Sequence, residues 1–257
     1  MGLDRDGLSF LYSENLRRSF EGCSLLTLGV LDNSFGFPVL KSMAEYYNTP
    51  LPEDLNVKKN PKKMFADCVD DSTVFTALGF SSLTRLDVSS YERADLIFDL
   101  NESHTPESVC EKYDVILDAG TLEHIFHLPN CLANLFKMLK KGGRILHILP
   151  STNEVDHGFY MFSPTLFFDY YGENGFQINH ISLLKRNKMR TIDHNNSQRN
   201  LTWNTNYYPG MFDSGAILAA SNEVIHVRVI VTKLEDSTFD KIPTQRNYKH
   251  IWSINWF

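Results

Sequence analysis

Residues 113–124, with the sequence YDVILDAGTLEH, constrain the fold of this chain more than any other stretch. The first five residues are mostly apolar and β-branched, which predicts a strand that is buried on both faces. The strand ends at Asp118, and a helix is expected to begin at Gly120 or Thr121 and to run up to Pro129. A carboxylate between a buried strand and a helix predicts a ligand-binding crevice at the carboxyl edge of a parallel sheet.

The rest of the chain alternates between strand and helix patterns in the same way. Lys140–Gly143 is expected to be the basic, glycine-ended stop of one of these helices. The alternation predicts an α/β fold with a doubly wound, mostly parallel, seven-stranded Rossmann-like sheet. Its last two strands have no helical pattern between them, which predicts an antiparallel edge strand. Besides 113–118, strands are expected at 23–28, 83–87, 94–101, 144–149, 176–184 and 223–233, and helices at 7–20, 37–47, 72–78, 129–139 and 163–171.

A length of 257 residues fits a single domain over residues 1–257 better than two ordinary domains. Four segments stand outside the alternating pattern. The aromatic tail at 234–257 contains Tyr248, Trp252 and Trp256, so we expect it to dock on the body of the protein or to join two copies in a homo-oligomer. The segments are a helical cover at 1–22, a proline-punctuated insertion at 48–66, an irregular insertion at 185–220 and an aromatic tail at 234–257.

The charge balance makes nucleic acid an unexpected partner. The formal net charge is −6, from 25 Lys and Arg against 31 Asp and Glu, and phosphate neutralisation needs the opposite excess. Two local basic runs, 58–63 and 185–190, can hold an anion or can be solvated loops.

Several patterns indicate a cytoplasmic protein that does not insert into a membrane. The first ten residues, MGLDRDGLSF, lack the basic and apolar regions of a signal peptide. No stretch approaches the roughly 20 apolar residues of a membrane span. The four cysteines are scattered, which suits a reducing compartment and argues against a zinc ribbon or a disulfide framework.

Four motifs carry a resemblance to a known family. They are DLN at 99–101, YDVILDAGTLEH at 113–124, LKKGG at 139–143 and HGFYMFSP at 157–164. On these motifs the chain resembles the class I S-adenosylmethionine-dependent methyltransferases, and in particular a branch found in surface-polysaccharide and secondary-metabolite gene clusters. The resemblance extends over about 24–233 at the level of strand order. It implies S-adenosylmethionine as the cofactor and a small molecule as the methyl acceptor.

The resemblance places the cofactor at the ends of the predicted strands. Asp87 would accept hydrogen bonds from the ribose hydroxyls, and Asp99 would bind the adenine amino group while Leu100 packs on the ring. Asp118, together with Gly120 and Thr121, would line the methionine end. Each of the three carboxylates can instead be an ordinary cap of a turn or a strand end.

The turn after the first strand departs from the family pattern. An acidic residue and a G-x-G sequence are usual there, whereas this chain reads TLGVLDN over 27–33 and retains only Gly29. One glycine can still allow a close backbone approach, with Asp32 or Asn33 adding a polar contact. The same turn disfavours a nicotinamide-dependent dehydrogenase, which needs G-x-G-x-x-G for a pyrophosphate.

Methyl transfer requires an aligned acceptor and, for a hydroxyl acceptor, a base. Histidine suits the role of base because its pKa lies near neutrality. His124 is next to Glu123, and the pair can be base and orienting residue, can hold a metal, or can be an ordinary first turn. His157 begins the loop that holds Phe159 and Tyr160, and it is the other candidate for the base.

Tyr160 counts among both the catalytic and the substrate-binding candidates. Phe159 and Asn153 are further candidates for contacts with the substrate, although Asn153 can equally serve in a turn. His127 lies four residues after Glu123 on the same predicted helical face. Two ligands do not make a metal site, so no metal is predicted. His147 lies inside a strand and is expected to be a satisfied core histidine.

These observations predict methyl transfer to a small polar acceptor, with an oxygen of a sugar or of an activated surface-glycan precursor as the first choice. A nitrogen acceptor, or a phosphate-type oxygen of a capsule modification, is the alternative within the class. The departure at Gly29 leaves a second alternative, a non-catalytic methyltransferase-like subunit that interacts through its tail. A hydride-transferring Rossmann enzyme is a distant third.

Overall fold

The computed structural model describes residues 2–60, 67–187, 201–212, 218–220, 222–246 and 248. The chain forms two compact units that are interleaved along the sequence. Unit 1 includes Met1–Asp99 and Tyr113–Thr121, and unit 2 includes Leu100–Lys112, Leu122–Met189 and Asn200–Phe257. The single domain over 1–257 remains a prediction.

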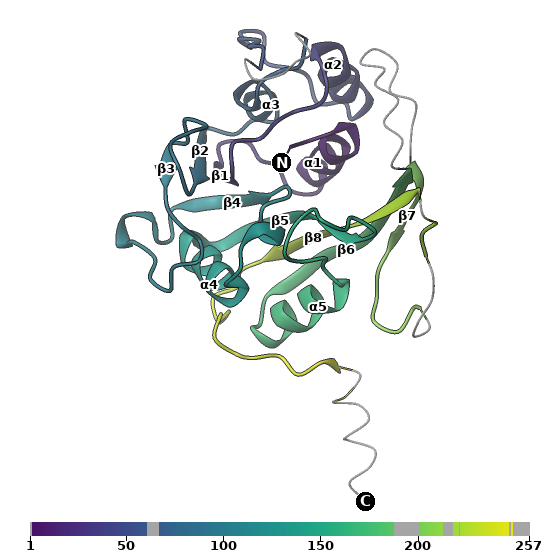
Figure 1. Ribbon diagram of the computed structural model, residues 1–257. Helices are drawn as coiled ribbons and strands as arrows, with labels where there is room; N and C mark the ends of the chain where they lie inside the picture. Colours follow the sequence, from purple (N-terminus) through teal and green to yellow (C-terminus); the bar gives the residue numbers. More distant parts are fainter. Residues whose placement is uncertain are drawn as a thin grey trace, which may run out of the picture. The chain divides into compact units, whose positions relative to one another are not determined.

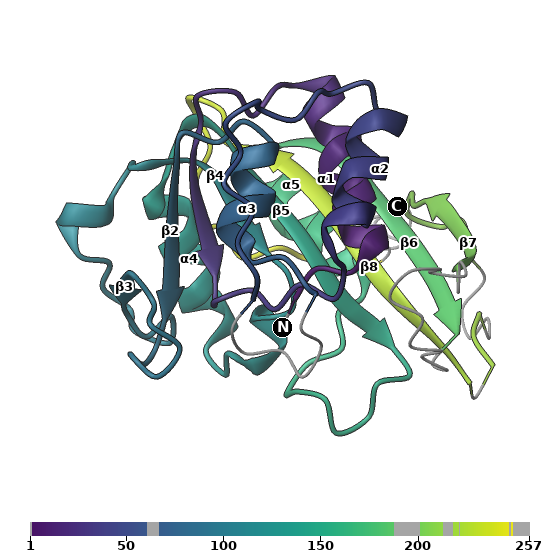
Figure 2. The same cartoon turned by 90° about the horizontal axis from the view of Figure 1, so that it is seen from above.

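The strands of unit 1 are parallel and lie in the order β3-β2-β1-β4 (Figure 2). Leu26 in β1 is in register with Thr84 in β2 and with Ile116 in β4. β1 and β4 are the most buried of the four, because all but one of the residues in each are buried. The strands are β1 (Ser24–Leu28), β2 (Ser82–Asp87), β3 (Leu96–Ile97) and β4 (Tyr113–Asp118).

Three helices accompany these strands in unit 1 (Figure 1): α1 (Arg5–Arg17), α2 (Phe37–Tyr46) and α3 (Asp71–Ala77). Carboxylates begin two of them, as expected of helix N-caps. The Asp4 side chain accepts from the Gly7 N–H at 2.8 Å, and Asp70 accepts from the Thr73 N–H at 2.9 Å. The Tyr12 ring of α1 is fully buried and stacks on Tyr47 with 5.6 Å between ring centroids.

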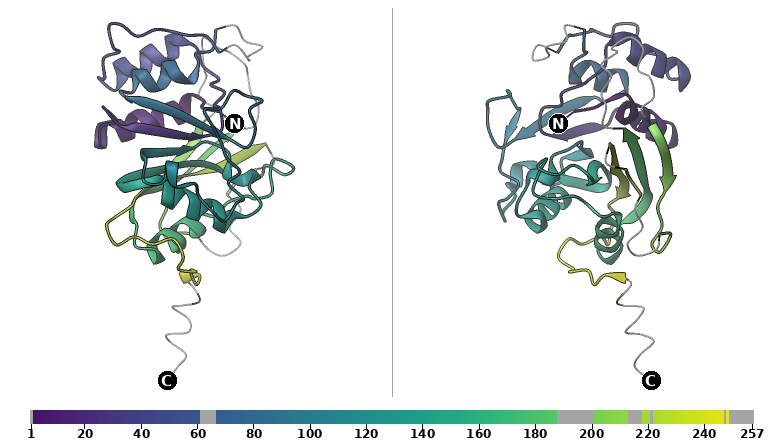
Figure 3. Two further views of the ribbon diagram at one scale, coloured as in Figure 1. Left: turned by 90° about the vertical axis from the view of Figure 1, so that its left-hand side faces the viewer. Right: turned by 45° about the vertical axis from the view of Figure 1, so that its right-hand side comes forward.

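The strands of unit 2 are antiparallel and lie in the order β5-β8-β6-β7. The antiparallel pair of β6 and β7 is visible in Figure 3. Among its described residues, unit 2 also has two helices, α4 (Leu128–Met138) and α5 (Pro164–Glu173), and two short 3-10 turns, η1 (Glu107–Val109) and η2 (Leu122–His124). The strands are β5 (Leu139–Thr152), β6 (Gln177–Asn187), β7 (Leu201–Asn206) and β8 (Glu223–Thr232).

The predicted α/β class, with parallel strands and an antiparallel edge, is confirmed. The described part of the chain has eight strands and not seven. The additional strand is β7, which pairs with β6 within the 185–220 segment, so that segment is not irregular throughout. The predicted strand at 94–101 is reduced to Leu96–Ile97, and Asp99 is the last residue of this stretch in unit 1.

The predicted helix from Gly120 or Thr121 up to Pro129 is wrong. Only the single turn η2 forms there, and α4 begins at Leu128. The carbonyl of Glu123 accepts hydrogen bonds from the N–H groups of Phe159 and Tyr160, at 2.7 and 3.2 Å. The His127 N–H, which would bond that carbonyl in an α-helix, donates to Asn101 Oδ1 at 2.9 Å. A distant loop therefore takes the place of the next helical turn.

Lys140–Gly143 is not a helix stop either. α4 ends at Met138, and these residues are the start of β5. Gly142 N–H donates to the Lys233 carbonyl at 2.7 Å, and Lys233 N–H donates to the Gly143 carbonyl at 2.9 Å. The segment is therefore paired with the chain that follows β8, which lengthens β5 to 14 residues.

The first part of the aromatic tail contacts α5 within unit 2. The Asn174 Oδ1 accepts from Thr238 Oγ1 at 2.9 Å and from the Lys241 N–H at 3.0 Å. Tyr170 donates its hydroxyl hydrogen to the Phe239 carbonyl at 3.1 Å. Trp252 and Trp256 lie outside the described residues. Among the helices that the structure describes, none combines the length and the apolar character that crossing a membrane requires.

Candidate active site

The carboxyl ends of the parallel strands of unit 1 gather the predicted cofactor residues at one edge of that sheet. Gly29 follows β1, Asp87 ends β2, Asp99 follows β3 and Asp118 ends β4. Because parallel strands share a direction, their carboxyl ends lie along a common edge. Each strand of this group therefore delivers a glycine or a carboxylate to the place where open α/β sheets bind ligands.

The turn after β1 is held in a conformation that suits glycine. Gly29 has a φ of 82°, and its N–H donates to the Leu86 carbonyl at 2.7 Å. The buried Thr27 hydroxyl donates to the Gly29 carbonyl at 2.9 Å. Thr27 was not among the sequence-predicted residues, and its position two residues before the glycine is the only signal for its role.

The turn after β4 is joined to the end of β1. Asp118 is fully buried, and its Oδ1 accepts from the Thr121 N–H at 3.0 Å. The Thr121 hydroxyl donates to the Leu28 carbonyl at 2.7 Å. Gly120, between them, has a φ of 93°. Asp118 therefore organises its own turn, and its placement at the carboxyl edge is the one predicted.

The remaining cofactor candidates have different surroundings. Asp87 is partly exposed, and its Oδ1 accepts from the Ser89 N–H at 2.9 Å, as in an Asx turn. Asp99 is also partly exposed, whereas Leu100 is buried and belongs to unit 2. Asp32 Oδ1 accepts from Asn60 Nδ2 at 2.9 Å, so that carboxylate already has a partner within unit 1.

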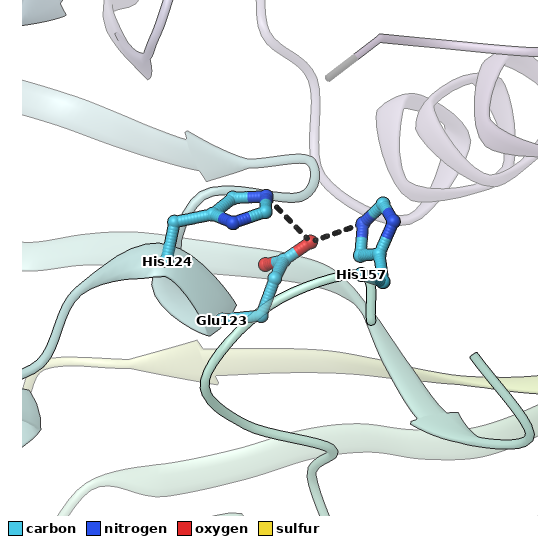
Figure 4. Close-up of side chains that lie close together, drawn as sticks. All are labelled: Glu123, His124 and His157. Carbon is cyan, nitrogen blue, oxygen red and sulfur yellow. Dashed lines mark hydrogen bonds and ion pairs between the residues drawn. The ribbon is translucent and has the colours of Figure 1, made fainter. Parts of the chain in front are cut away.

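The catalytic candidates of unit 2 form a compact cluster of two imidazoles about one carboxylate (Figure 4). Glu123 Oε1 lies 3.3 Å from His157 Nε2 and 3.8 Å from His124 Nε2. The Glu123 side chain is only 1% exposed, whereas those of His124 and His157 are 41% and 47% exposed. We call these three residues the Glu-His-His cluster. Both histidines proposed as alternative bases thus contact the same carboxylate.

The loop after β5 fixes Glu123 from the backbone side. The N–H groups of Phe159 and Tyr160 both donate to the Glu123 carbonyl. A Cβ atom on Gly158 would lie 2.8 Å from the same carbonyl oxygen and 3.0 Å from Glu123 Cγ. Only a glycine can approach so closely without displacing the backbone, which explains the glycine after His157. Its role was not predicted from the sequence.

The same loop is anchored at its base by Asn153. Its Nδ2 donates to the carbonyls of Ala220 and Glu223, at 2.8 and 2.6 Å, and its φ is 68°. These contacts favour the turn role that the sequence left open. The His157 N–H donates to the Glu154 carbonyl at 3.1 Å. Burial raises the pKa of Glu154, but His226 at 3.3 Å, together with the charges of His157 and Arg186, outweighs this effect and the pKa is lowered.

Aromatic side chains flank the cluster. The rings of Phe126 and Phe159 meet edge to face with 5.7 Å between centroids, and both are well exposed. Tyr160 donates its hydroxyl hydrogen to the Phe126 carbonyl at 2.7 Å, so this hydroxyl helps to hold the backbone of Phe126 in place. Exposed apolar rings beside polar groups are typical of ligand-binding surfaces.

Two other histidines lie outside the cluster. His127 is not a member of the cluster, so the pairing of Glu123 with His127 is replaced by a pairing with His124 and His157. His147 is fully buried, and its Nε2 lies 2.7 Å from the Tyr171 hydroxyl. The prediction of a satisfied core histidine is confirmed.

Comparisons with known proteins give a structural likeness alone. No protein-family model matches the chain, and no curated protein matches it. Solved structures that it resembles include a 1,6-didemethyltoxoflavin-N1-methyltransferase of Burkholderia thailandensis, with 10% identity, 90% of this chain and 78% of that chain covered, and a TM-score of 0.43. TehB of Haemophilus influenzae has 11% identity, 88% and 62% coverage, and a TM-score of 0.45.

A third similar structure is a SAM-dependent methyltransferase of Aquifex aeolicus. It has 12% identity and a TM-score of 0.40, and the match covers 89% of this chain and 98% of that chain. At such identities and TM-scores, these likenesses carry no argument about the activity of this chain.

Proposed function

We propose that this chain is an S-adenosylmethionine-dependent methyltransferase that acts on a small polar acceptor. The observation that carries the proposal is the carboxyl edge of unit 1. There Gly29, Asp87, Asp99 and Asp118 follow or end four parallel strands. The sequence motifs that resemble class I methyltransferases supply Asp99 and Asp118 at this edge.

The donor set fits the cofactor by its chemistry. S-adenosylmethionine carries a positively charged sulfur and an ammonium group, a ribose diol and an adenine amino group. The ammonium, the diol and the amino group donate hydrogen bonds that carboxylates accept, and the positive sulfur attracts negative charge. In this proposal Asp87 accepts from the ribose, Asp99 from adenine, and the Asp118 turn with Gly120 and Thr121 lines the methionine end. Gly29 allows the backbone to approach closely.

The cofactor, when bound, supplies a methyl carbon on a positively charged sulfur, which takes up the electron pair of the broken C–S bond. The chain has to hold the acceptor in line and remove its proton. Alignment contributes on the order of 7–11 kcal/mol. His157 Nδ1 or His124 Nδ1, the ring nitrogen that does not face Glu123, would accept the proton of an acceptor hydroxyl as the new O–C bond forms, which adds roughly 10²–10⁴-fold. Glu123 stabilises the resulting imidazolium, because its buried carboxylate lies within 3.8 Å of both rings.

For the acceptor we propose an oxygen of a sugar or of an activated glycan precursor. The exposed rings of Phe126 and Phe159 beside the Glu-His-His cluster support this choice. An aromatic face packs well on the apolar face of a pyranose while the hydroxyls reach polar neighbours. A nitrogen acceptor or a phosphate-type oxygen remains the alternative, and the latter would have little need of a base.

Isothermal titration with S-adenosylmethionine and S-adenosylhomocysteine tests the proposal. We expect micromolar binding by the parent protein and at least a tenfold loss of affinity in Asp87→Ala, because a hydrogen bond to a charged group contributes roughly 1.5–3 kcal/mol. His157→Ala is the matched control for affinity. It should bind the cofactor as tightly as the parent, and its turnover should be at least tenfold lower.

The absence of binding at millimolar cofactor, in the presence and absence of candidate acceptors, would contradict the proposal. A non-catalytic methyltransferase-like subunit would then be the better description. Its loss of cofactor binding would be explained by the turn at Gly29, which lacks the usual acidic residue and G-x-G sequence.

A further inference from the structure

We propose that Glu123, His124 and His157 bind a divalent transition-metal ion of the zinc class. The claim concerns the free protein and does not depend on methyl transfer. The three candidate ligand atoms all lie within 4.8 Å of one another, and the cluster belongs entirely to unit 2 (Figure 4).

The donor types select the class of metal. Two neutral imidazole nitrogens and one carboxylate oxygen form the ligand set of several catalytic zinc sites and of non-haem iron sites. Imidazole ligands favour zinc, cobalt, nickel and iron over magnesium and calcium, which prefer oxygen. The ligand types of the Glu-His-His cluster therefore favour a transition-metal ion.

The two distances from the carboxylate are close to those between ligands of one metal ion. Two ligands about 2.0–2.1 Å from a tetrahedral ion are about 3.3–3.4 Å apart. The Glu123 Oε1 to His157 Nε2 distance is 3.3 Å, and the distance to His124 Nε2 is 3.8 Å. A small rotation of the half-exposed His124 side chain would bring the third ligand into range.

Burial gives the site an inner and an outer side. The carboxylate of Glu123 is almost fully buried, and a buried carboxylate is stabilised by a cation beside it. The two imidazoles are each nearly half exposed. Three protein ligands, of which only the carboxylate is buried, leave a fourth position open to water or to a ligand on the exposed side, which is the arrangement of catalytic metal sites and not of closed structural ones.

The scaffold already holds the ligands in place. The Glu123 carbonyl is bonded by the Phe159 and Tyr160 N–H groups, and Gly158 packs directly on its side chain. The His157 N–H is bonded to the Glu154 carbonyl. A preformed set of ligands costs little ordering entropy when the ion binds. A bound ion would also lower the pKa of a hydroxyl coordinated at the fourth position.

Titration of the metal-free, tag-free full chain with Zn²⁺, followed by calorimetry, tests the proposal. Co²⁺ serves as a second probe, because its visible absorption reports coordination by imidazole and carboxylate. We expect one ion per chain with micromolar or tighter affinity. His157→Ala and Glu123→Gln should each weaken binding at least tenfold and reduce the Co²⁺ bands, since each removes one ligand.

His127→Ala is the matched control, because His127 is an exposed histidine three residues from the cluster. It should bind Zn²⁺ and Co²⁺ as the parent does. The proposal is overturned if the parent binds neither ion, or if His127→Ala and His157→Ala lose affinity equally. His157→Ala alters an exposed loop residue, so circular dichroism should confirm that it folds. Cofactor binding is a separate measurement, so failure of one proposal does not imply failure of the other.

Discussion

At the scale of single residues, Gly158 shows how the backbone prepares the candidate site. The residue is on an exposed loop, yet its Cα lies against the carbonyl and the side chain of Glu123. The two following N–H groups bond that carbonyl. A glycine is required here by proximity and not by φ, since its φ is not among the positive values.

We predict that Gly158→Ala loosens this loop and lowers stability by about 1–3 kcal/mol, because the new Cβ would meet backbone atoms at 2.8 Å. The amides of Phe159 and Tyr160 should exchange hydrogen faster, since their bonds to the Glu123 carbonyl are lost. Thermal unfolding and hydrogen exchange measure the two effects.

Gly172→Ala is the control with the opposite sign. Gly172 lies in α5, and a Cβ there would make an ordinary contact of 3.9 Å with Ile178. Its replacement should raise stability by up to about 1 kcal/mol, because alanine has less conformational entropy than glycine in the unfolded chain. If both variants shifted stability in the same direction, the close packing of Gly158 would not matter.

At the scale of elements, Arg85 joins β2 to α3 within unit 1. Its guanidinium donates to both carboxylate oxygens of Asp71, in the first turn of α3, at 2.8 and 2.7 Å. It also contacts Asp95, just before β3, at 3.1 Å. Its hydrogen bonds to Asp71 raise its pKa, and burial only partly opposes this rise. The planar, bidentate geometry is specific to arginine.

We predict that Arg85→Lys destabilises the protein by about 1–3 kcal/mol, because lysine cannot reproduce the two parallel hydrogen bonds and leaves the buried Asp71 poorly paired. The midpoint of urea unfolding should fall while the m-value stays unchanged.

Lys59→Ala provides the comparison. The Lys59–Asp67 pair spans 3.2 Å, but its side chains are 70% and 86% exposed. Its loss should change stability by less than about 0.5 kcal/mol. Equal effects of the two substitutions would show that Arg85 acts as an ordinary surface charge.

At the scale of the whole molecule, the tail is the segment whose purpose is least explained. Its first part is bonded to Asn174 and Tyr170, which accounts for residues 238–241. Trp252 and Trp256 lie further along, outside the described residues. The homo-oligomer expected from these aromatic residues remains a prediction.

We predict that the full chain forms a homo-oligomer and that a chain ending at Tyr248 is a monomer, because the deleted residues carry large apolar side chains suited to an interface. Light scattering after size-exclusion chromatography gives the two masses. The deletion keeps the contacts of 238–241, so the melting temperature of the monomer serves as the control for folding. An unchanged mass would remove the tail from the interface.

Local chemistry determined several elements in advance. The run over 113–118 forms β4 with the predicted bounds, because an apolar, β-branched segment between polar residues has few alternatives. Asp70 and Ser163 cap α3 and α5, because their side chains reach N–H groups only two or three residues away. Each of these features depends on neighbours in the sequence.

Other features depend on partners that lie far away in the sequence, and only the tertiary structure decided them. The helix expected after Gly120 is replaced by η2 because N–H groups from residues 159 and 160 take the Glu123 carbonyl. β7 exists because it pairs with β6. The sequence by itself determined the α/β class, the strand ends with their carboxylates and the individual candidates Glu123, His124 and His157. The tertiary structure alone places both histidines beside the Glu123 carboxylate. The contact between His157 and Glu123 joins residues 34 positions apart, and no local sequence pattern predicts it.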